Sequence, residues 1–162
     1  MRLFFSSFTL ITLLVVSIIP CGVLAENAPN KHKVLSLASP NNEIVLHFTD
    51  EDDLARYQLS FNGKEVIGLS KLGFTFAKAL PMYRDFRLSE VSRNRVDSSW
   101  EQPWGEQRII RDHHNELVVK YTDINNAQNI FYVRARAFEE CIGFRYEVPA
   151  DSSRDITREL TE

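Results

Sequence analysis

Cysteine is scarce in this chain, and its scarcity limits how the fold can be held together. Only Cys21 and Cys141 occur among the 162 residues. Residues 1–25 are typical of a signal peptide, with Arg2 before an apolar run and a small-residue cleavage site ending at Ala25. Cleavage there removes Cys21, so the mature chain can form no internal disulfide. We therefore expect an exported domain that is stabilised by its core.

A basic surface is also lacking, because Lys and Arg number 19 against 22 Asp and Glu. Nucleic acid binding calls for a concentrated basic face, so we expect no nucleic acid partner. No long apolar run follows the signal peptide, which predicts no membrane span after cleavage. The signal peptide itself predicts a periplasmic or extracellular location. A retained membrane anchor and a lipoprotein signal ending at Cys21 are the alternatives for the N-terminus.

Helical periodicity is absent as well. Residues 26–33 are polar and predict a flexible lead, whereas from Val34 onward apolar residues recur at every second position. In one such run Phe131 and Val133 share a face opposite Ile130 and Tyr132, and Asn62-Gly63 marks a two-residue hairpin turn. The pattern predicts one all-β domain over residues 34–162, an antiparallel β-sandwich of about nine to eleven strands.

Motifs for nucleophilic catalysis and for metal binding are missing too. There is no GxSxG sequence, and Cys141 in a predicted turn is expected to be an ordinary thiol that is buried or half-buried. His113 and His114 are adjacent, so on a strand their rings face opposite sides and cannot share a metal. The acidic run Asp50–Asp53 lacks the ligand spacing of a calcium loop and predicts a solvated turn. We predict no catalytic residue, no metal site and no cofactor in this chain.

The stretch VDSSWEQPWGEQRIIRDHHNEL (residues 96–117) is the most distinctive part of the sequence. It holds both tryptophans of the chain and two of its four histidines. Glu101 and Glu106 flank Trp104 and could supply the two carboxylates of glycoside hydrolysis, but sequence cannot place them across a sugar ring. For Trp100 and Trp104 we expect packing in a core or an interface, with direct carbohydrate contact as the alternative.

Five segments in order carry a resemblance to a known family. They are SPNNEIVLHF, YQLSFNGKEVIGLSKLGFTF, the stretch quoted above, IFYVRARAFEECIGFRYEVP and ITRELTE. Together they resemble the N-terminal domain of glycoside hydrolase family 97, which includes bacterial α-glucosidases and α-galactosidases. The resemblance spans residues 37–162 and implies a β-supersandwich similar to that of mutarotase-like carbohydrate enzymes. It also implies a following catalytic (β/α)8 barrel, which is missing from this chain, and calcium in the full-length enzyme with acidic ligands downstream of Glu162.

The function implied by the resemblance is that of a non-catalytic domain supporting an exported α-glycoside hydrolase. An α-linked oligosaccharide would be bound together with the barrel. Trp100, Glu101, Trp104, Gly105 and Glu106 are then predicted to form a loop between two strands that contacts substrate or the barrel. The alternative is a stand-alone carbohydrate-binding β-sandwich without hydrolase activity, and independent glycosidase activity is a third possibility.

Three further expectations follow from the resemblance and the pattern. The family commonly has glycine in the turn where this chain has Glu139-Glu140-Cys141, so the geometry of that turn is open. The alternating pattern of Asp155–Glu162 predicts a strand that continues to the last residue. Because a barrel would normally cover one face of the sandwich, its absence should expose apolar side chains and favour self-association.

Overall fold

The computed structural model describes residues 32–149 and 155–162. The predicted signal peptide (1–25) and the predicted lead (26–33), apart from His32 and Lys33, lie outside the described residues. The described residues form ten strands and one short 3-10 turn, which agrees with the number of strands expected from the alternation. They contain no helix of the length and apolarity that crossing a membrane would require.

The first sheet is an antiparallel meander of four strands in sequence order. These strands are β1 (Val34–Ala38), β2 (Ile44–Thr49), β3 (Arg56–Phe61) and β4 (Lys64–Lys71). Asn62 and Gly63 connect β3 to β4 with φ angles of 48° and 74°. Positive φ at both central residues is the requirement of a type I′ turn, so the predicted Asn-Gly hairpin is confirmed.

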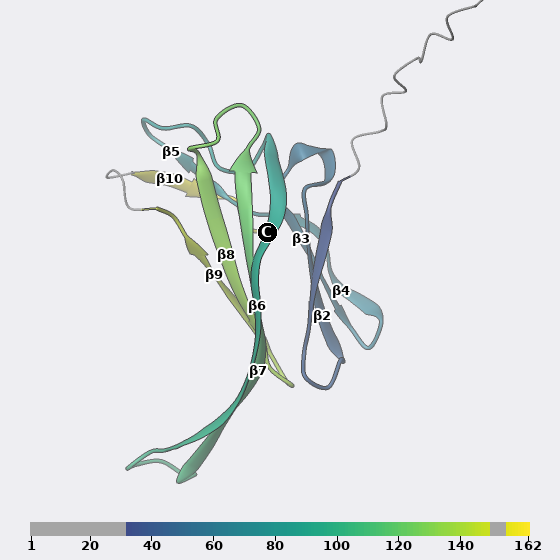
Figure 1. Ribbon diagram of the computed structural model, residues 1–162, viewed down its shortest axis with the longest axis vertical. Coiled ribbons are helices and arrows are strands. Elements are labelled where there is room, and N and C mark those ends of the chain that lie inside the picture. The colour runs from purple at the N-terminus through teal and green to yellow at the C-terminus, as the bar shows by residue number, and fades with distance from the viewer. Residues whose placement is uncertain (1–31, 150–154) are drawn as a thin grey trace, which may run out of the picture. The chain divides into compact units, whose positions relative to one another are not determined.

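The second sheet also has four antiparallel strands in sequence order and lies face to face with the first (Figure 1). Its strands are β6 (Phe86–Glu101), β7 (Ile109–Asp123), β8 (Ile130–Ala137) and β9 (Ile142–Glu147). Side chains from both sheets form one core. The antiparallel β-sandwich predicted from the period-two pattern is therefore confirmed.

The core lies between the sheets and follows the alternation of each strand. On β8, Phe131 and Val133 are fully buried, whereas Ile130 and Tyr132 on the other face are only half-buried. The ring of Phe131 stacks on Tyr121 at 5.0 Å. The Tyr121 hydroxyl is buried as well and donates to the carbonyl oxygens of Thr49 at 3.1 Å and of Arg56 at 3.2 Å, which ties β7 to the first sheet.

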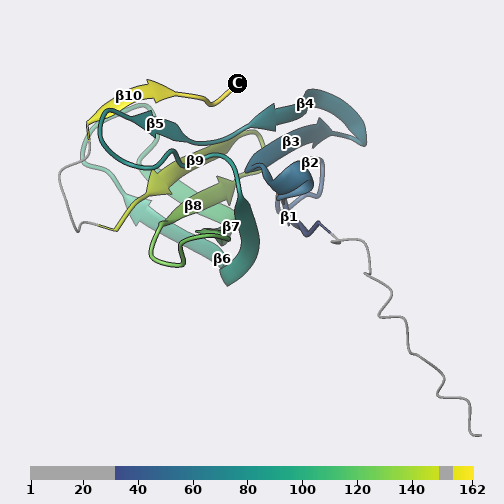
Figure 2. The same ribbon diagram turned by 90° about the horizontal axis from the view of Figure 1, so that it is seen from above.

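A small two-stranded sheet pairs β5 (Phe74–Phe76) with β10 (Ile156–Glu159) (Figure 2). The strand predicted to reach the last residue thus ends at Glu159, which corrects that expectation. Residues 160–162 follow the strand and form hydrogen bonds that are not part of a strand pairing. Leu160 donates its amide to the Gly73 carbonyl at 2.9 Å, and the hydroxyls of Thr161 and Tyr146 lie 2.7 Å apart.

Asp50 departs from the predicted solvated turn. Residues Glu51–Asp53 form a 3-10 turn (η1), but the Asp50 side chain is buried. Its two carboxylate oxygens accept hydrogen bonds from the backbone amides of Lys33 at 2.6 Å and Leu88 at 3.0 Å. Asp50 therefore joins the start of the first sheet to β6. The expectation was wrong because the donors come from distant parts of the chain and cannot be seen in the acidic run.

The turn between β8 and β9 resolves the question raised by the cysteine at its end. Ala137 pairs with Ile142, and the amide of Phe138 donates to the carbonyl of Cys141 at 2.8 Å. Cys141 is not among the described residues with positive φ. The turn closes without the conformation that favours glycine. Cys141 is a free thiol and is exposed, which corrects the expectation of a buried or half-buried side chain, because the turn projects it into solvent.

Candidate functional site

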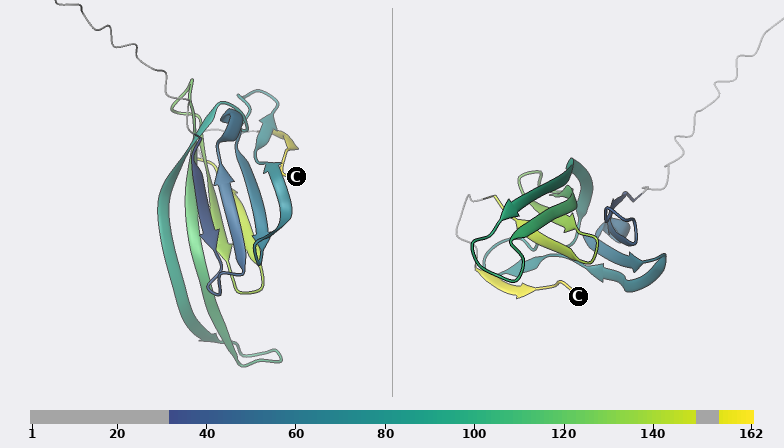
Figure 3. Two further views of the ribbon diagram at one scale, coloured as in Figure 1. Left: turned by 90° about the vertical axis from the view of Figure 1, so that its right-hand side faces the viewer. Right: turned by 90° about the horizontal axis from the view of Figure 1, so that it is seen from below.

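The predicted loop at Trp100–Glu106 is the end of a long β-hairpin. Strands β6 and β7 pair without interruption from Arg93 opposite Leu117 to Glu101 opposite Ile109. Trp100 and Glu101 are therefore strand residues, which corrects the loop prediction, and only residues 102–108 form the turn. Residues 109–117 lie in β7, the second strand of the hairpin. We call residues 95–113 the arm, because this part of the hairpin extends past the end of the sandwich (Figure 3).

Both tryptophans lie at the exposed end of the arm. Trp100 is 53% exposed and Trp104 is 85% exposed, and Ile109 beside them is 66% exposed. Packing in the core of this sandwich is therefore excluded for both rings. The expectation of an interface or a sugar contact stays open, since either would cover side chains of this kind.

The turn at the end of the arm has a defined conformation. The Gln102 amide donates to the Arg108 carbonyl at 2.9 Å, and its side-chain Nε2 donates to the Gln107 carbonyl at 2.7 Å. Gly105 has φ of 123°, and a Cβ at this position would lie 2.5 Å from Gln102 Nε2. A side chain at residue 105 would therefore strain the backbone and displace Gln102.

The two glutamates of the arm have different surroundings. Glu101 accepts a hydrogen bond from Arg108 Nε at 2.5 Å, whereas Glu106 has no hydrogen-bond partner in residues 32–149 and 155–162. Both are exposed. A general acid in glycoside hydrolysis is usually held protonated by a buried environment, which neither position offers within the described residues. The geometry of the arm therefore gives no support to a catalytic pair at Glu101 and Glu106.

Ion pairs along one face hold the arm together near the sandwich. Arg111 donates to both carboxylate oxygens of Asp97 at 2.9 Å, and this hydrogen-bonded pair lowers the pKa of Asp97. His113 Nδ1 lies 3.0 Å from Glu139, and its Nε2 lies 3.3 Å from Arg95. Bidentate arginine–carboxylate pairs fix orientation as well as distance, so the arm is a defined ribbon.

The two adjacent histidines face opposite sides of β7, as predicted. His113 belongs to the ion-paired face, whereas His114 is buried against Phe138 with ring centroids 4.9 Å apart. His114 Nδ1 lies 2.6 Å from Asp112. Within the part of the chain that the structure describes, no group of three or more His, Cys, Asp or Glu side chains is placed to hold a metal ion.

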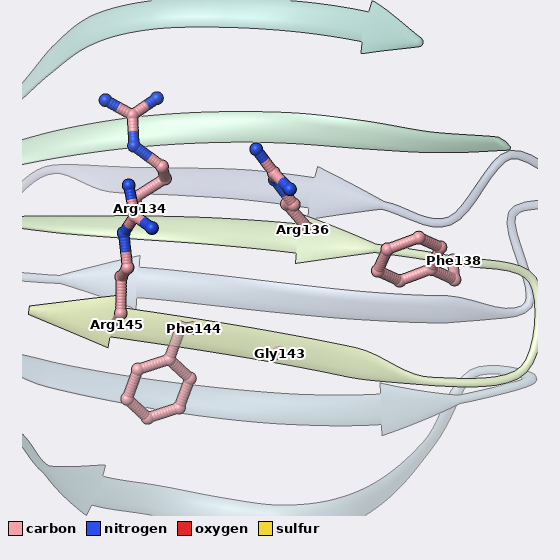
Figure 4. A pocket seen from close by; sticks show the side chains of 6 residues that line it. All are labelled: Arg134, Arg136, Phe138, Gly143, Phe144 and Arg145. Atoms are coloured by element: carbon pink, nitrogen blue, oxygen red, sulfur yellow. The ribbon is translucent and has the colours of Figure 1, made fainter. Parts of the chain in front are cut away.

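A second cluster, which the sequence analysis did not single out, lies on the outer face of the second sheet (Figure 4). Arg134 donates to Glu147 at 2.7 Å and to Glu116 at 2.8 Å, and Arg136 donates to Glu116 at 2.8 Å. Arg145 donates to Glu147 at 3.0 and 2.8 Å. The three arginines line a hollow of about 310 Å³ together with Phe138, Gly143 and Phe144.

The arginines of this cluster keep its carboxylates ionised. Hydrogen bonds from Arg134 and Arg145 lower the pKa of Glu147 to about 2. Burial alone would raise the pKa of Glu116, but hydrogen bonds from Arg136 and Arg134 outweigh it and lower the pKa. The available sequence signal was Arg134 and Arg136 two positions apart on a strand, which places both on the face opposite Phe131 and Val133.

Comparison with known proteins places the fold in a family. The family described as Glycosyl-hydrolase 97 N-terminal matches residues 37–162. A retaining alpha-galactosidase from Bacteroides thetaiotaomicron is 26% identical over 124 residues, which cover 76% of this chain and 18% of that protein. A glycoside hydrolase family 97 enzyme from Pseudoalteromonas sp. strain K8, solved in complex with panose, is 35% identical with a TM-score of 0.73.

These relatives are much longer than the chain. The match to the enzyme solved with panose covers 78% of this chain and 20% of that one, and a family 97 enzyme from the same strain solved with acarbose gives the same values. A beta-arabinopyranosidase at 20% identity, with a TM-score of 0.69, shares the fold. The chain spans about a fifth of the length of the relatives it matches. Because the family match covers most of its residues, the chain belongs to the Glycosyl-hydrolase 97 N-terminal family, as a domain found at the start of family 97 enzymes.

Proposed function

We propose that this chain is the non-catalytic N-terminal domain of an exported α-glycoside hydrolase. In this proposal the sandwich packs on and supports a catalytic (β/α)8 barrel that follows it, and the signal peptide at residues 1–25 directs the protein to the periplasm or the exterior. The arm reaches the region where the enzyme binds an α-linked oligosaccharide. The single observation that carries the proposal is the exposure of Trp100 and Trp104 on a projecting hairpin of a family 97 N-terminal domain.

The composition of the arm supports a contact role. A two-stranded ribbon is only marginally stable in water, and large exposed apolar side chains usually mark a binding surface. Tryptophan is also among the residues that contribute most to interfaces, because one ring buries a large area with little loss of conformational freedom. Trp100, Trp104 and the turn held by Gly105 are therefore the proposed contact, with Glu101 and Glu106 as its polar edge.

The proposed ligand follows from the relatives. Two family 97 structures similar to this chain hold panose or acarbose, and another relative is a retaining alpha-galactosidase. An α-linked oligosaccharide is accordingly the proposed substrate of the whole enzyme. The described residues lack a set of ligands suited to calcium, so the calcium implied by the family resemblance is proposed to bind residues downstream of Glu162.

The non-catalytic part of the proposal is tested on the purified chain. It should not hydrolyse aryl α-glucosides or aryl α-galactosides in a sensitive chromogenic assay. Hydrolysis that disappears in a Glu101→Gln/Glu106→Gln variant would show that the chain is itself an enzyme and would contradict the proposal.

The contact role is tested in a longer enzyme that contains this domain. Replacing both tryptophans, as Trp100→Ala/Trp104→Ala, should lower kcat/KM for an α-linked oligosaccharide by about 10-fold or more, since misplaced substrate contacts cost about that much. Leu80→Ala is the control, because Leu80 is also exposed (55%) but lies outside the arm. Equal kcat/KM values for the two variants would show that the arm does not contribute to substrate turnover.

A stand-alone carbohydrate-binding role is the second candidate, favoured by the 85% exposure of the Trp104 ring. Aromatic rings exposed in this way can stack against a sugar without help from another domain. The two tryptophans make the test direct, because all tryptophan fluorescence of the chain comes from the arm. A saturable change in emission on adding panose to the isolated chain would support this candidate over a purely interdomain contact.

A further inference from the structure

The hollow over β9 offers hydrogen-bond donors that the protein itself does not use. Arg136 bonds Glu116 through Nε, and its two terminal nitrogens have no hydrogen-bond partner in the described residues. Arg145 bonds Glu147 through Nε and Nη2, which leaves Nη1 unbonded within the same part of the chain. Arg136 and Arg145 are 49% and 68% exposed, so these donors are open to a ligand.

Acceptors, in contrast, are already occupied. Both oxygens of Glu116 accept from arginines at 2.8 Å. Glu147 Oε1 accepts from Arg134 and Arg145, and its Oε2 accepts from Arg134 at 3.4 Å. A group that only accepts hydrogen bonds suits this hollow better than a neutral sugar hydroxyl, which needs an acceptor for its own proton. The planar guanidinium forks match a carboxylate in shape and charge.

The hollow also has room and an apolar wall. Arg136 lies opposite Gly143 on β9, and Arg134 lies opposite Arg145. A Cβ on Gly143 would meet no atom within 4 Å, so the space above its backbone is open. The Phe138 ring lies at one end of the space and the arginines along its side (Figure 4). A glycine inside a strand commonly marks a place where a ligand approaches the backbone.

The charge arrangement is unbalanced without such a ligand. Arg134 and Arg145 lie directly opposite each other on neighbouring strands, and Glu147 accepts hydrogen bonds from both. Three arginines face two glutamates in the cluster, which leaves one positive charge uncompensated. An anionic group bound between Arg136 and Arg145 would balance it.

We propose that this hollow binds the carboxylate of a hexuronic acid, with the sugar ring above Gly143 and against Phe138. The ligand class is thus an acidic saccharide, which is distinct from the α-linked substrate assigned to the arm. The inference rests on the carbohydrate association of the proposed function but uses a different face of the domain. If the hollow does not bind a hexuronic acid, the proposed role of the arm is therefore unaffected.

The test is a titration of the purified chain, followed by NMR chemical shifts, with glucuronate, glucose and acetate as separate ligands. Glucuronate should give saturable shifts at residues around Gly143 and bind at least about 10-fold more tightly than acetate, while glucose should give no saturable shift. Affinity should fall as salt is added, because the site is exposed and depends on charge. Acetate binding as tightly as glucuronate would overturn the assignment to a sugar, and so would equal binding of glucose.

Variants then assign the binding to the hollow. Arg136→Gln and Arg145→Gln should each weaken glucuronate about 10-fold, which corresponds to about 1.4 kcal/mol. Gly143→Val should abolish binding by filling the space, and a strand accepts valine, so the circular dichroism spectrum should be retained. Arg158→Gln is the matched control, an exposed arginine on β10 that should leave affinity unchanged. Full affinity in Arg136→Gln or in Gly143→Val would overturn the proposal.

Discussion

Strands β6 and β7 run through both the body of the sandwich and the arm, yet different forces hold the two regions. In the body, Phe86 and Tyr121 are fully buried on these strands. In the arm, Trp100 at the end of β6 and Trp104 in the turn are exposed, and ion pairs such as Asp97–Arg111 replace apolar contacts. The two strands pair with each other in both regions, with one register shift between Glu90 and Ser92 in the body.

Within this one hairpin, the body contributes to stability and the arm carries the proposed contact. Burial of a large apolar side chain contributes about 1.5–3 kcal/mol, so the body accounts for most of the stability. Exposed ion pairs contribute little to the free energy of unfolding, so the arm neither stabilises nor destabilises the domain by much. In the proposed function, this region adds little to the fold and carries both tryptophans for contact with the barrel or the substrate.

The largest expected effect compares an aromatic side chain from each region. Phe131→Ala should lower the free energy of unfolding by about 3–5 kcal/mol, because the fully buried ring stacks on Tyr121 and meets Phe86 at 5.2 Å. Trp104→Ala should change it by less than about 0.5 kcal/mol. Urea denaturation of both variants measures the contrast. A loss in Trp104→Ala that approaches the loss in Phe131→Ala would break the distinction between body and arm.

A buried carboxylate gives a smaller test of the same distinction. Asp50→Asn should lower the free energy of unfolding by about 1–3 kcal/mol. The asparagine side chain has only one oxygen, whereas the backbone N–H groups of Lys33 and Leu88 each need an acceptor. Asp97→Asn in the arm is the matched control and should cost less, because Asp97 is exposed to water. Thermal unfolding of the two variants decides the matter. Equal losses would mean that the arm contributes to stability as the body does.

The smallest expected effect concerns acid stability and Glu147. Its pKa is lowered from 4.5 to about 2 by hydrogen bonds from Arg134 and Arg145. The folded chain therefore favours the ionised form, and this contribution is complete above about pH 4.5 and lost as the pH falls towards 2. Glu147→Gln should reduce the decrease in unfolding free energy across that interval, measured by urea denaturation at several pH values. A decrease as steep as in the unchanged chain would contradict the ion-pair network.

Much of the body could be predicted from sequence, because a strand that is buried on one face has apolar residues at every second position. Strand β8 is an example, with Phe131 and Val133 on the face opposite Ile130 and Tyr132. The Asn62-Gly63 turn could be predicted because both residues tolerate positive φ. The arm could not be predicted in the same way. Between Arg93 and Ser99 every residue except the half-buried Val96 is exposed, so no alternation of apolar and polar residues marks the strand. Its pairing depends on residues 111–117.

The polar clusters were hidden for a related reason. Asp50 stands in an acidic run that is typical of solvated turns, and only the fold brings the Lys33 and Leu88 amides to it. The arginine cluster joins three strands, and the sequence shows just Arg134 and Arg136 two positions apart. Sequence patterns report what one strand buries, whereas these groups depend on what neighbouring strands supply.

The most direct measurement of the body–arm distinction is acrylamide quenching of tryptophan fluorescence, since both tryptophans lie in the arm. The chain should be studied at a concentration where light scattering shows a monomer, because self-association through exposed apolar side chains would protect the rings. The account predicts a native emission maximum close to that of the urea-unfolded chain and quenching rates that differ by less than about twofold, because Trp100 and Trp104 are both largely exposed to water. A blue-shifted native emission with strongly reduced quenching in the monomer would show that the tryptophans are packed into the domain, and the arm would then have no free contact surface.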